Sequence, residues 1–374
     1  MRQQKVVLVT YPEEFTMEEA KGLIESMSNY KIVKTFTQKY LNRARFGMGM
    51  GKAEELKQFI SQNSDIEKVF VDEHLSAKQL FNLEDLLKIS VIDRERLILD
   101  IFYSRATTTE SKLQIQLAEV QYEIPKIREN ARLMSKSGER AGKGGMGEYV
   151  VDVQFRDLKR QMSFIKDKLA SAHLKRQEYR KQRLRKGMFI VSLVGYTSSG
   201  KTTLFNLLTD EHKETSHSLF TTLSTVTRSL RLPSKVNEND PENSNILLVD
   251  TVGFISRLPH YMIEAFKSTL EESLEADLIL FLIDSSEEID DIGRKYSSSL
   301  GVLQELNVDQ SKLYILLTKA DKANSEKLQE IMDYMDPSIS KLPVSSKTGD
   351  GLEELQNLIY SKKKSRNSTI LGES

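Results

Sequence analysis

The chain has 374 residues, 39% of them hydrophobic and 29% charged, which excludes disorder throughout and predicts two or three domains. It contains no cysteine, so disulfides, thiolate-bound zinc, iron–sulfur clusters and a cysteine nucleophile are excluded. The five histidines lack the spacing of metal ligands, and neither a signal peptide nor an apolar run long enough to span a membrane is recognised. We therefore expect a soluble, cytoplasmic protein without membrane insertion.

Basic and acidic residues balance at 54 each, but they are unevenly distributed along the chain. Residues 1–100 carry 15 basic and 16 acidic side chains, residues 101–187 carry 20 and 10, and residues 188–374 carry 19 and 28. A net charge of zero argues against a uniformly basic nucleic-acid-binding surface. The basic middle segment is instead the part that we expect to meet nucleic acid.

Short apolar segments alternate with helical patterns over the first hundred residues. Strands are predicted at residues 5–9, 32–36, 68–71 and 89–92, and helices at residues 13–28, 52–62 and 76–88. Strands that alternate with helices form βαβ units, so the sequence predicts a small α/β domain over residues 1–100.

The segment 101–187 carries two apolar series with the alternating three- and four-residue spacing of a coiled-coil seam. The first series runs from Leu113 to Met134 and the second from Phe155 to Ala172. A glycine-rich stretch separates them, so we predict an antiparallel helical hairpin with a flexible tip at about residues 135–150. Two helices packed on a neighbouring domain would give the same pattern.

Two further features of this hairpin bear on its structure. Pro125 lies inside the first series and should kink or locally break that helix. The second series is followed by a basic run, residues 175–186, which fits either a solvated helix end or linker, or a direct contact with RNA.

The α/β pattern returns from residue 188. Strands are predicted at residues 189–194, 245–249, 278–283, 313–317 and 341–344, with helical stretches between most of them. These elements predict a second α/β domain, with a mostly parallel sheet, over residues 188–361. The remaining residues, 362–374, are expected to form a flexible tail.

Residues 195–202 read GYTSSGKT, a complete G-x-x-x-x-G-K-[ST] phosphate-binding motif between a predicted strand and a predicted helix. Its glycines let backbone N–H groups close around phosphates, and the helix N-terminus favours negative charge. Lys201 is expected to reach the β- and γ-phosphates, and the Thr202 hydroxyl to bind Mg²⁺. The strand–loop–helix context argues against an accidental match.

Three later motifs indicate which nucleotide is bound. Asp250 and Gly253 form a D-x-x-G motif after a strand, where the carboxylate can hold Mg²⁺ through water and the Gly253 N–H can sense the γ-phosphate. In residues 318–321 (TKAD), Asp321 can accept two hydrogen bonds from guanine, which adenine does not offer. Residues 345–347 (SSK) would supply a backbone donor to guanine O6. The four motifs together predict GTP rather than ATP.

Residues 220–223 (FTTL) lie in the loop between the first two motifs, where a nucleotide-sensing switch is expected. A hydroxyl of Thr221 or Thr222 should complete the Mg²⁺ coordination when a γ-phosphate is present. The alternative is a threonine-rich loop whose hydroxyls cap a helix.

These motifs resemble the HflX family of ribosome-associated GTPases. The resemblance rests on GYTSSGKTTLFN, LFTTLSTVTR, DTVGFISRLPHYMIEAFKSTLEE and VSSKTGDGLEEL, and extends through the helical segment and GMGMGKAEELK to cover about residues 1–360. It implies an α/β fold in three parts: a small α/β domain, an antiparallel helical hairpin and a P-loop GTPase domain. It also implies binding to the large ribosomal subunit, in ribosome splitting or the rescue of stalled ribosomes.

Position by position, the resemblance implies that Thr202 and Thr222 bind Mg²⁺ and that Lys201, Thr222 and Gly253 are the catalytic residues. The implied residues for GTP and GDP are Gly195, Tyr196, Thr197, Ser198, Ser199, Gly200, Lys201, Thr202, Phe220, Thr221, Thr222, Leu223, Ser224, Asp250, Thr251, Val252, Gly253, Thr318, Lys319, Ala320, Asp321, Ser345, Ser346 and Lys347.

The sequence departs from the family pattern at three places. Ser198 replaces an Asn that related GTPases associate with a catalytic potassium ion, so potassium dependence is not carried over. Thr318 replaces the Asn of N-K-x-D, although a Thr can still tie that loop to the phosphate loop. Residues 144–148 (GGMGE) replace the usual R-G-P-G-E of the tip, so tip function is not carried over either.

The residue after Gly253 is Phe254, where Ras-like enzymes carry a water-orienting Gln. A phenyl ring cannot hydrogen-bond water, so we predict slow basal turnover, with the catalytic arrangement completed by a switch rearrangement or by a partner. Arg228 and Arg257 are candidate contributors from the chain itself, although surface or switch packing is the favoured interpretation of both.

The basic hairpin, with Arg140 and Lys143 at its tip, fits a contact with rRNA phosphates. Two alternatives remain open: a GTP-timed ribosome-assembly or RNA-remodelling factor, and a protein-interaction switch that binds no ribosome. The glycine cluster at residues 46–52 could hold a second nucleotide, but a structural turn is favoured. We expect a monomer.

Overall fold

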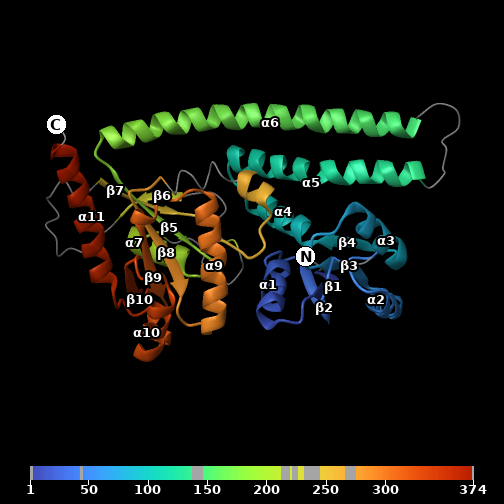
Figure 1. Cartoon of the computed structure of the whole chain (residues 1–374), viewed down its shortest axis with the longest axis horizontal. Helices are drawn as coiled ribbons and strands as arrows, with labels where there is room; N and C mark the ends of the chain where they lie inside the picture. The colour runs from blue at the N-terminus through green and yellow to red at the C-terminus, as the bar shows by residue number, and fades with distance from the viewer. Residues whose placement is uncertain are drawn as a thin grey trace. The chain divides into compact units, whose positions relative to one another are not determined.

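Two sheets organise the chain, one in each of two units; the first is parallel and the second is mostly parallel. The computed structural model describes residues 3–42, 45–136, 146–211, 220, 226–230, 245–265 and 275–372. Contacts among these residues divide the chain into the units 1–171 and 172–374 (Figure 1). The boundaries expected at residues 100 and 187 remain a prediction.

The first unit begins with alternating strands and helices, as the sequence predicts. They are β1 (Gln4–Thr10), α1 (Glu14–Glu25), β2 (Tyr30–Thr37), α2 (Met50–Gln62), β3 (Ile66–Val71), α3 (Ala77–Leu87) and β4 (Ser90–Asp93). The strands pair in parallel in the order β2-β1-β3-β4. Parallel neighbours need a crossover connection, and the intervening helices supply it.

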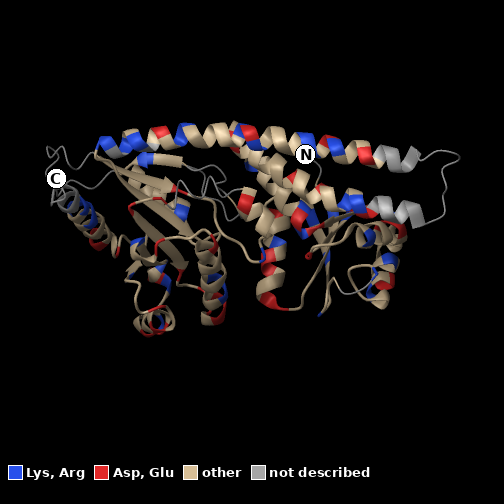
Figure 2. Cartoon of the chain, turned by 45° about the horizontal axis from the view of Figure 1, so that its top comes forward, with Lys and Arg blue, Asp and Glu red and all other residues tan. Residues whose placement is uncertain are grey.

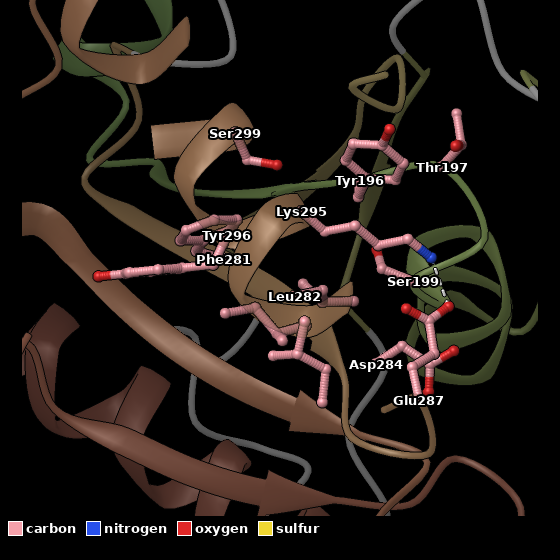
Figure 3. Close-up of a pocket in the computed structure, with 12 residues that line it drawn as sticks. Tyr196, Thr197, Ser199, Phe281, Leu282, Asp284, Glu287, Lys295, Tyr296 and Ser299 are labelled. Atoms are coloured by element: carbon pink, nitrogen blue, oxygen red, sulfur yellow. Dashed lines mark hydrogen bonds and ion pairs between the residues drawn. The ribbon is translucent and has the colours of Figure 1, made fainter. Parts of the chain in front are cut away.

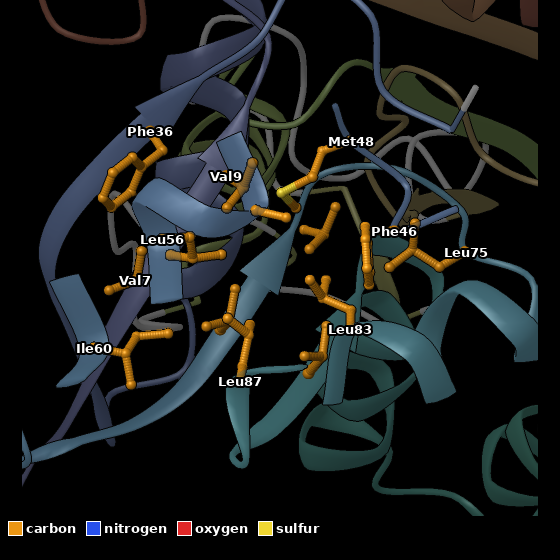
Figure 4. Packing of buried hydrophobic residues seen from close by; sticks show 14 of the residues in the cluster. Val7, Val9, Phe36, Phe46, Met48, Leu56, Ile60, Leu75, Leu83 and Leu87 are labelled. Atoms are coloured by element: carbon orange, nitrogen blue, oxygen red, sulfur yellow. The ribbon is translucent and has the colours of Figure 1, made fainter. Parts of the chain in front are cut away.

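One face of this sheet holds a hydrophobic core. Val7 and Val9 of β1 meet Leu56 of α2 and Leu83 of α3, all fully buried (Figure 4). Phe46 and Met48 belong to the same cluster, so the first half of the glycine-rich segment 46–52 is packed into the core, whereas Met50 and Gly51 are exposed. Gly47 has a positive φ of 72°, and a Cβ there would collide with the Leu75 side chain. This packing agrees with the structural turn that the sequence favours.

Three helices follow: α4 (Arg94–Arg105), α5 (Thr109–Lys136) and α6 (Met146–Arg185). Pro125 does not break the helix, because α5 continues through it and packs against α3 and α4; the kink that the sequence offered as the alternative stays a prediction. In α6, Ile165 of the predicted seam is buried, and Arg128 of α5 lies 4.5 Å from the ring centroid of Phe155, so the two helices touch. The tip itself, with Arg140 and Lys143, lies outside the described residues.

The second unit contains a six-stranded sheet. Its elements are β5 (Phe189–Gly195), α7 (Lys201–Thr209), β6 (Val226–Ser229), β7 (Ile246–Asp250), β8 (Leu278–Asp284), α9 (Ile289–Glu305), η2 (Gln310–Lys312), β9 (Leu313–Thr318), η3 (Ala320–Lys322), α10 (Ser325–Tyr334), β10 (Lys341–Val344) and α11 (Leu352–Gly372). The strand order is β10-β9-β8-β5-β7-β6. The five predicted strands are confirmed. The short antiparallel edge strand β6 has no clear signal in the sequence and was not predicted.

The end of the chain differs from the expected flexible tail, because α11 continues as a helix to Gly372. The Arg366 guanidinium anchors this part of α11 by donating to the Met188 carbonyl (2.9 Å) and to the Asp277 carboxylate (3.0 Å). Among the described residues, no helix is long and apolar enough to cross a membrane.

Candidate nucleotide-binding site

The predicted motifs meet at one edge of the second sheet. Four parallel strands, β5, β7, β9 and β10, each carry a motif at or just beyond the carboxyl end. Carboxyl ends of parallel strands share an edge, and in open α/β sheets this is where ligands bind. The topology therefore brings together segments that are up to 150 residues apart in the sequence.

The phosphate loop connects β5 to α7. Gly200 precedes the helix with a φ of 89°, in the left-handed region that favours glycine. Lys201 is only 6% exposed, and its Nζ donates to the carbonyls of Gly195 (2.9 Å) and Tyr196 (2.6 Å). Burial lowers the pKa of Lys201 to about 8, although the Asp250 carboxylate opposes this shift.

The first two predicted Mg²⁺-related groups lie together. The Thr202 hydroxyl donates to a carboxylate oxygen of Asp250, 3.3 Å away, and Asp250 is fully buried at the end of β7. An alcohol and a carboxylate are oxygen ligands of the kind that Mg²⁺ takes, so this pair fits the ion. The other predicted ligand, Thr222, lies outside the described residues, as do Thr221, Leu223 and Ser224.

The residues after Asp250 run beside the phosphate loop. The Thr251 hydroxyl donates to the Leu193 carbonyl (2.7 Å), so this side chain joins β7 to β5. The Thr197 N–H donates to the Phe254 carbonyl (2.8 Å), and the Phe254 N–H donates to the Gly195 carbonyl (3.0 Å). These bonds form a short parallel bridge that fixes the segment 250–254 against the phosphate loop.

Gly253 lies close against that loop. A Cβ at this position would lie 2.9 Å from Thr197 Cα and 3.0 Å from Lys201 Nζ, so a side chain would not fit. Gly253 and the phosphate-loop lysine therefore lie together, as a site that closes on a γ-phosphate requires. Phe254, which follows, is buried at 3% exposure.

Tyr196 has a role that the sequence does not reveal. Its hydroxyl accepts a hydrogen bond from the Ser256 N–H (2.7 Å), and Lys295 Nζ of α9 lies 5.3 Å from its ring centroid. Lys295 in turn pairs with Glu287 at 2.5 Å (Figure 3). The Tyr196 side chain thus connects the phosphate loop to the segment around Ser256 and to α9. These contacts span long sequence separations, so no local pattern could have found them.

The predicted guanine-binding groups also assemble. The Thr318 hydroxyl donates to the Ser199 carbonyl (2.8 Å), and Lys319 pairs with Asp284 of β8 at 2.5 Å. The Ser345 hydroxyl donates to a carboxylate oxygen of Asp321 (2.7 Å). This hydrogen bond is the main cause of the lowered pKa of Asp321. Asp321 is therefore held as the carboxylate that can accept hydrogen bonds from guanine.

The remaining predicted residues are less closely involved. Ala320 lies in η3, Ser346 and Lys347 follow Ser345 in a turn, and Val252 lies between Thr251 and Gly253. Ser198 is exposed in the phosphate loop, and Phe220 is buried. Arg228 pairs with Glu211 at 2.5 Å, which agrees with surface packing. Arg257 adopts a positive φ of 53°.

The sheet order, the phosphate loop and the guanine-recognition loop define a P-loop GTPase. The model of the 50S ribosome-binding GTPase family matches residues 190–319. Models described as GTP-binding GTPase N-terminal and GTP-binding GTPase middle region match residues 14–103 and 105–183.

Curated relatives specify the family. GTPase HflX of Methanocaldococcus jannaschii is 39% identical over 345 residues, which cover 92% of this chain and 82% of the relative. GTPase HflX of Thermococcus kodakarensis is 39% identical over 321 residues, which cover 86% and 70%. The chain belongs to the HflX family of GTPases, and it is a GTP-hydrolysing enzyme.

Solved structures agree with this assignment. A structure described as a complex of SsGBP and GDP matches with a TM-score of 0.57 and 27% identity, over 98% of this chain and 99% of that one. A GTP-binding protein from the archaeon Sulfolobus solfataricus in complex with GDP matches with a TM-score of 0.52 and 26% identity, over 96% and 99%.

Proposed function

We propose that this GTPase is Mg²⁺-dependent and associates with the large ribosomal subunit, in ribosome splitting or the rescue of stalled ribosomes. Family membership supports the nucleotide chemistry, and the name of the matched GTPase-domain family supports a ribosomal partner. The observation that carries the ribosomal proposal is the basic surface of α6.

The nucleotide lies along the edge formed by the four motifs. The phosphate-loop amides and Lys201 hold the β- and γ-phosphates, and the Gly253 N–H contacts the γ-phosphate. Asp321 accepts hydrogen bonds from guanine, and a backbone amide of residues 345–347 donates to guanine O6. Lys319 lies along the base while its ammonium stays paired with Asp284.

Thr202 and Asp250 are the described residues that would hold Mg²⁺, the first directly and the second through water. When bound, the ion would neutralise charge that develops on the phosphate oxygens. Thr222 is proposed as the further ligand from the switch segment. Lys201 contributes positive charge from the other side of the phosphates, and its burial strengthens that contribution.

Basal hydrolysis is proposed to be slow, because Phe254 supplies no hydrogen bond to the attacking water. Its backbone groups are both bonded to the phosphate loop, so the segment is held in place but lacks the polar side chain of Ras-like enzymes. A partner that reshapes the switch segments would complete the catalytic arrangement, and the ribosome is the proposed partner.

Helix α6 carries the charge for that interaction. Its forty residues include eleven Lys or Arg and five Asp or Glu, and the basic side chains recur along its length (Figure 2). Lys175, Lys181 and Arg185 near its end are exposed. Exposed cations along a helix can neutralise successive RNA phosphates, with an affinity that falls as salt rises.

The first experiment is GTP turnover by the full-length protein, alone and with purified large ribosomal subunits. We expect a clear rise in turnover with the subunits and an unchanged rate with small subunits. Tight GTP binding without any rise would refute ribosomal activation and favour the protein-interaction switch.

Charge-reversal variants then test the route of contact. We expect K175E/K181E/R185E to bind large subunits about tenfold more weakly in co-sedimentation and to show a shallower salt dependence. The matched control is K57E/K78E/K88E, which changes the charge equally at exposed positions of the first unit. Equal losses in both variants would contradict a specific contact through α6.

A further inference from the structure

Thr197 is the residue of the phosphate loop that lies against Gly253. Its Cα and its Cγ2 would both be 2.9 Å from a Cβ on Gly253, and Lys201 Nζ would be 3.0 Å from the same point. The side chain is 4% exposed and lies next to Tyr196 (Figure 3). Thr197 thus lies against the glycine that is proposed to contact the γ-phosphate, and Lys201 Nζ approaches the same glycine.

The Thr197 hydroxyl has no hydrogen-bond partner within the described ranges, although it is buried. Its backbone N–H, by contrast, is bonded to the Phe254 carbonyl. A buried hydroxyl without a partner is unfavourable, so such groups in native proteins usually serve a ligand or a water molecule. The γ-phosphate that is proposed to lie beside Gly253 would supply a ligand oxygen, and the water that attacks it would supply the second partner.

Phe254 follows Gly253 directly, at the position where Ras-like enzymes carry a polar side chain that orients the attacking water. The hydrolytic site therefore lacks a polar side chain at this position. A Thr hydroxyl has one donor and two acceptor lone pairs, so it can donate to a phosphate oxygen while it accepts from a water. Thr197 lies on the opposite side of the bridge from Phe254 and is joined to it by a 2.8 Å backbone hydrogen bond.

We propose that Thr197 is a catalytic residue of GTP hydrolysis, whose hydroxyl donates to a γ-phosphate oxygen and accepts from the attacking water. The inference rests on the proposed placement of the γ-phosphate beside Gly253, not on ribosome binding. It assigns to the phosphate loop a task that Ras-like enzymes give to the residue after the D-x-x-G motif.

The chemistry leaves Thr197 unchanged. The water oxygen forms a bond to the γ-phosphorus, and the bond between that phosphorus and the β–γ bridging oxygen breaks. The electron pair of the broken bond stays on the β-phosphate of GDP, and the water proton passes to the inorganic phosphate. The hydroxyl orients the water and stabilises negative charge on the phosphoryl oxygens.

The test compares single-turnover GTP hydrolysis by the wild-type protein, T197V and T197S, with Mg²⁺ and without ribosomes. Valine keeps the volume of threonine but lacks the hydroxyl, whereas serine keeps the hydroxyl. We expect the single-turnover rate of T197V to be lower than that of the wild-type protein by about tenfold or more, and the rate of T197S to stay near the wild-type value. GDP affinity should change less than about threefold in both variants, because the proposed contact of the hydroxyl is with the γ-phosphate, which GDP lacks.

Ser299 provides the matched control. Its buried hydroxyl also has no partner among the described residues. Ser299 lines one pocket together with Thr197, but it belongs to α9 and not to the phosphate loop (Figure 3). S299A should hydrolyse GTP at the wild-type rate.

Three results would overturn the proposal: wild-type hydrolysis by T197V, an equal loss in T197S, or an equal loss in S299A. If T197V fails to bind GDP, T197A is compared with T197S instead, because these two variants also differ in the presence of the hydroxyl. Equal single-turnover rates in that pair would also refute the proposal. Ribosome binding is measured separately by co-sedimentation, so its failure leaves this comparison intact.

Discussion

The hydroxyl of Thr318 donates a hydrogen bond to the main-chain carbonyl of Ser199, 2.8 Å away and 119 residues earlier in the chain. The bond joins the guanine-recognition loop after β9 to the phosphate loop after β5. A hydroxyl can thus make the link for which the family pattern has an Asn amide. The two loops that are proposed to hold the two ends of the nucleotide are therefore one connected structure.

Replacing Thr318 by Val should weaken GDP and GTP binding by similar factors. Removal of the hydroxyl leaves the buried Ser199 carbonyl without this donor, which costs about 1–3 kcal/mol, or about fivefold to 150-fold in affinity. T318N should retain most of the affinity because its amide can also donate. Competition titration with a fluorescent GDP analogue measures both variants. A loss confined to GTP would contradict this account.

Replacing Asp321 by Asn should change the base preference. The Asn amide would face guanine N1–H and the 2-amino group with a donor, so GDP affinity should fall by about 2–4 kcal/mol as two charge-assisted hydrogen bonds are lost. Xanthosine diphosphate, which has an oxygen at position 2, should gain affinity.

The control for this variant is S345A. It removes the hydrogen bond from Ser345 to Asp321 but keeps the carboxylate, so it should weaken GDP without any gain for the xanthine nucleotide. Isothermal titration with both nucleotides distinguishes the variants. Unchanged base preference in D321N would show that Asp321 does not read the base.

Nucleotide affinity should depend on pH through Lys201. Burial lowers the pKa of the free protein's Lys201 to about 8, and bound phosphates would raise it by favouring the ammonium form. Below pH 8 the lysine is already charged, so GDP affinity should be flat. Above pH 8 binding must take up a proton, so affinity should fall toward about tenfold per pH unit.

Calorimetry in two buffers of different ionisation enthalpy checks the proton uptake directly. The control is K201R, because an arginine stays charged at these pH values, and its remaining affinity should not follow this dependence. A pH-independent affinity of the wild-type protein up to pH 9 would mean that Lys201 is not the titrating group.

Stability of the first unit should depend on Arg94. Its side chain is 3% exposed and pairs with Glu19 at 2.7 Å and with Asp72 at 2.6 Å. R94M would leave two buried carboxylates without their cation, so the free energy of unfolding should fall by about 3–5 kcal/mol. Hydrogen exchange of peptides from β1 and β3 in the full-length protein measures this loss locally.

The control for Arg94 is Arg160, whose ion pair with Asp157 on α6 is exposed. R160M should change the free energy of opening that hydrogen exchange reports for the same strands by less than about 1 kcal/mol, because exposed ion pairs contribute little to stability. Similar effects of R94M and R160M would contradict a special role for the buried cluster.

Much of the fold follows from local sequence patterns. The strands at residues 5–9 and 189–194 are near-continuous apolar runs, as expected where a parallel strand is covered on both faces. The phosphate loop is recognisable because its residues must be contiguous to wrap one ligand. The antiparallel strand β6 escaped prediction because its four residues lie at a sheet edge and are only partly covered.

The sequence alone determined which chemistry the chain can perform. The motifs GYTSSGKT, DTVG and TKAD, in that order, predict a GTPase because each is a run of neighbouring residues expected to serve one part of the nucleotide. Only the tertiary structure decided how these motifs are joined. The contacts of Thr318 with Ser199, Tyr196 with Ser256 and Thr197 with Phe254 bring together the ends of different strands and the loops that follow them. Such contacts depend on sheet order and burial, and these produce no periodic pattern among neighbouring residues of the sequence.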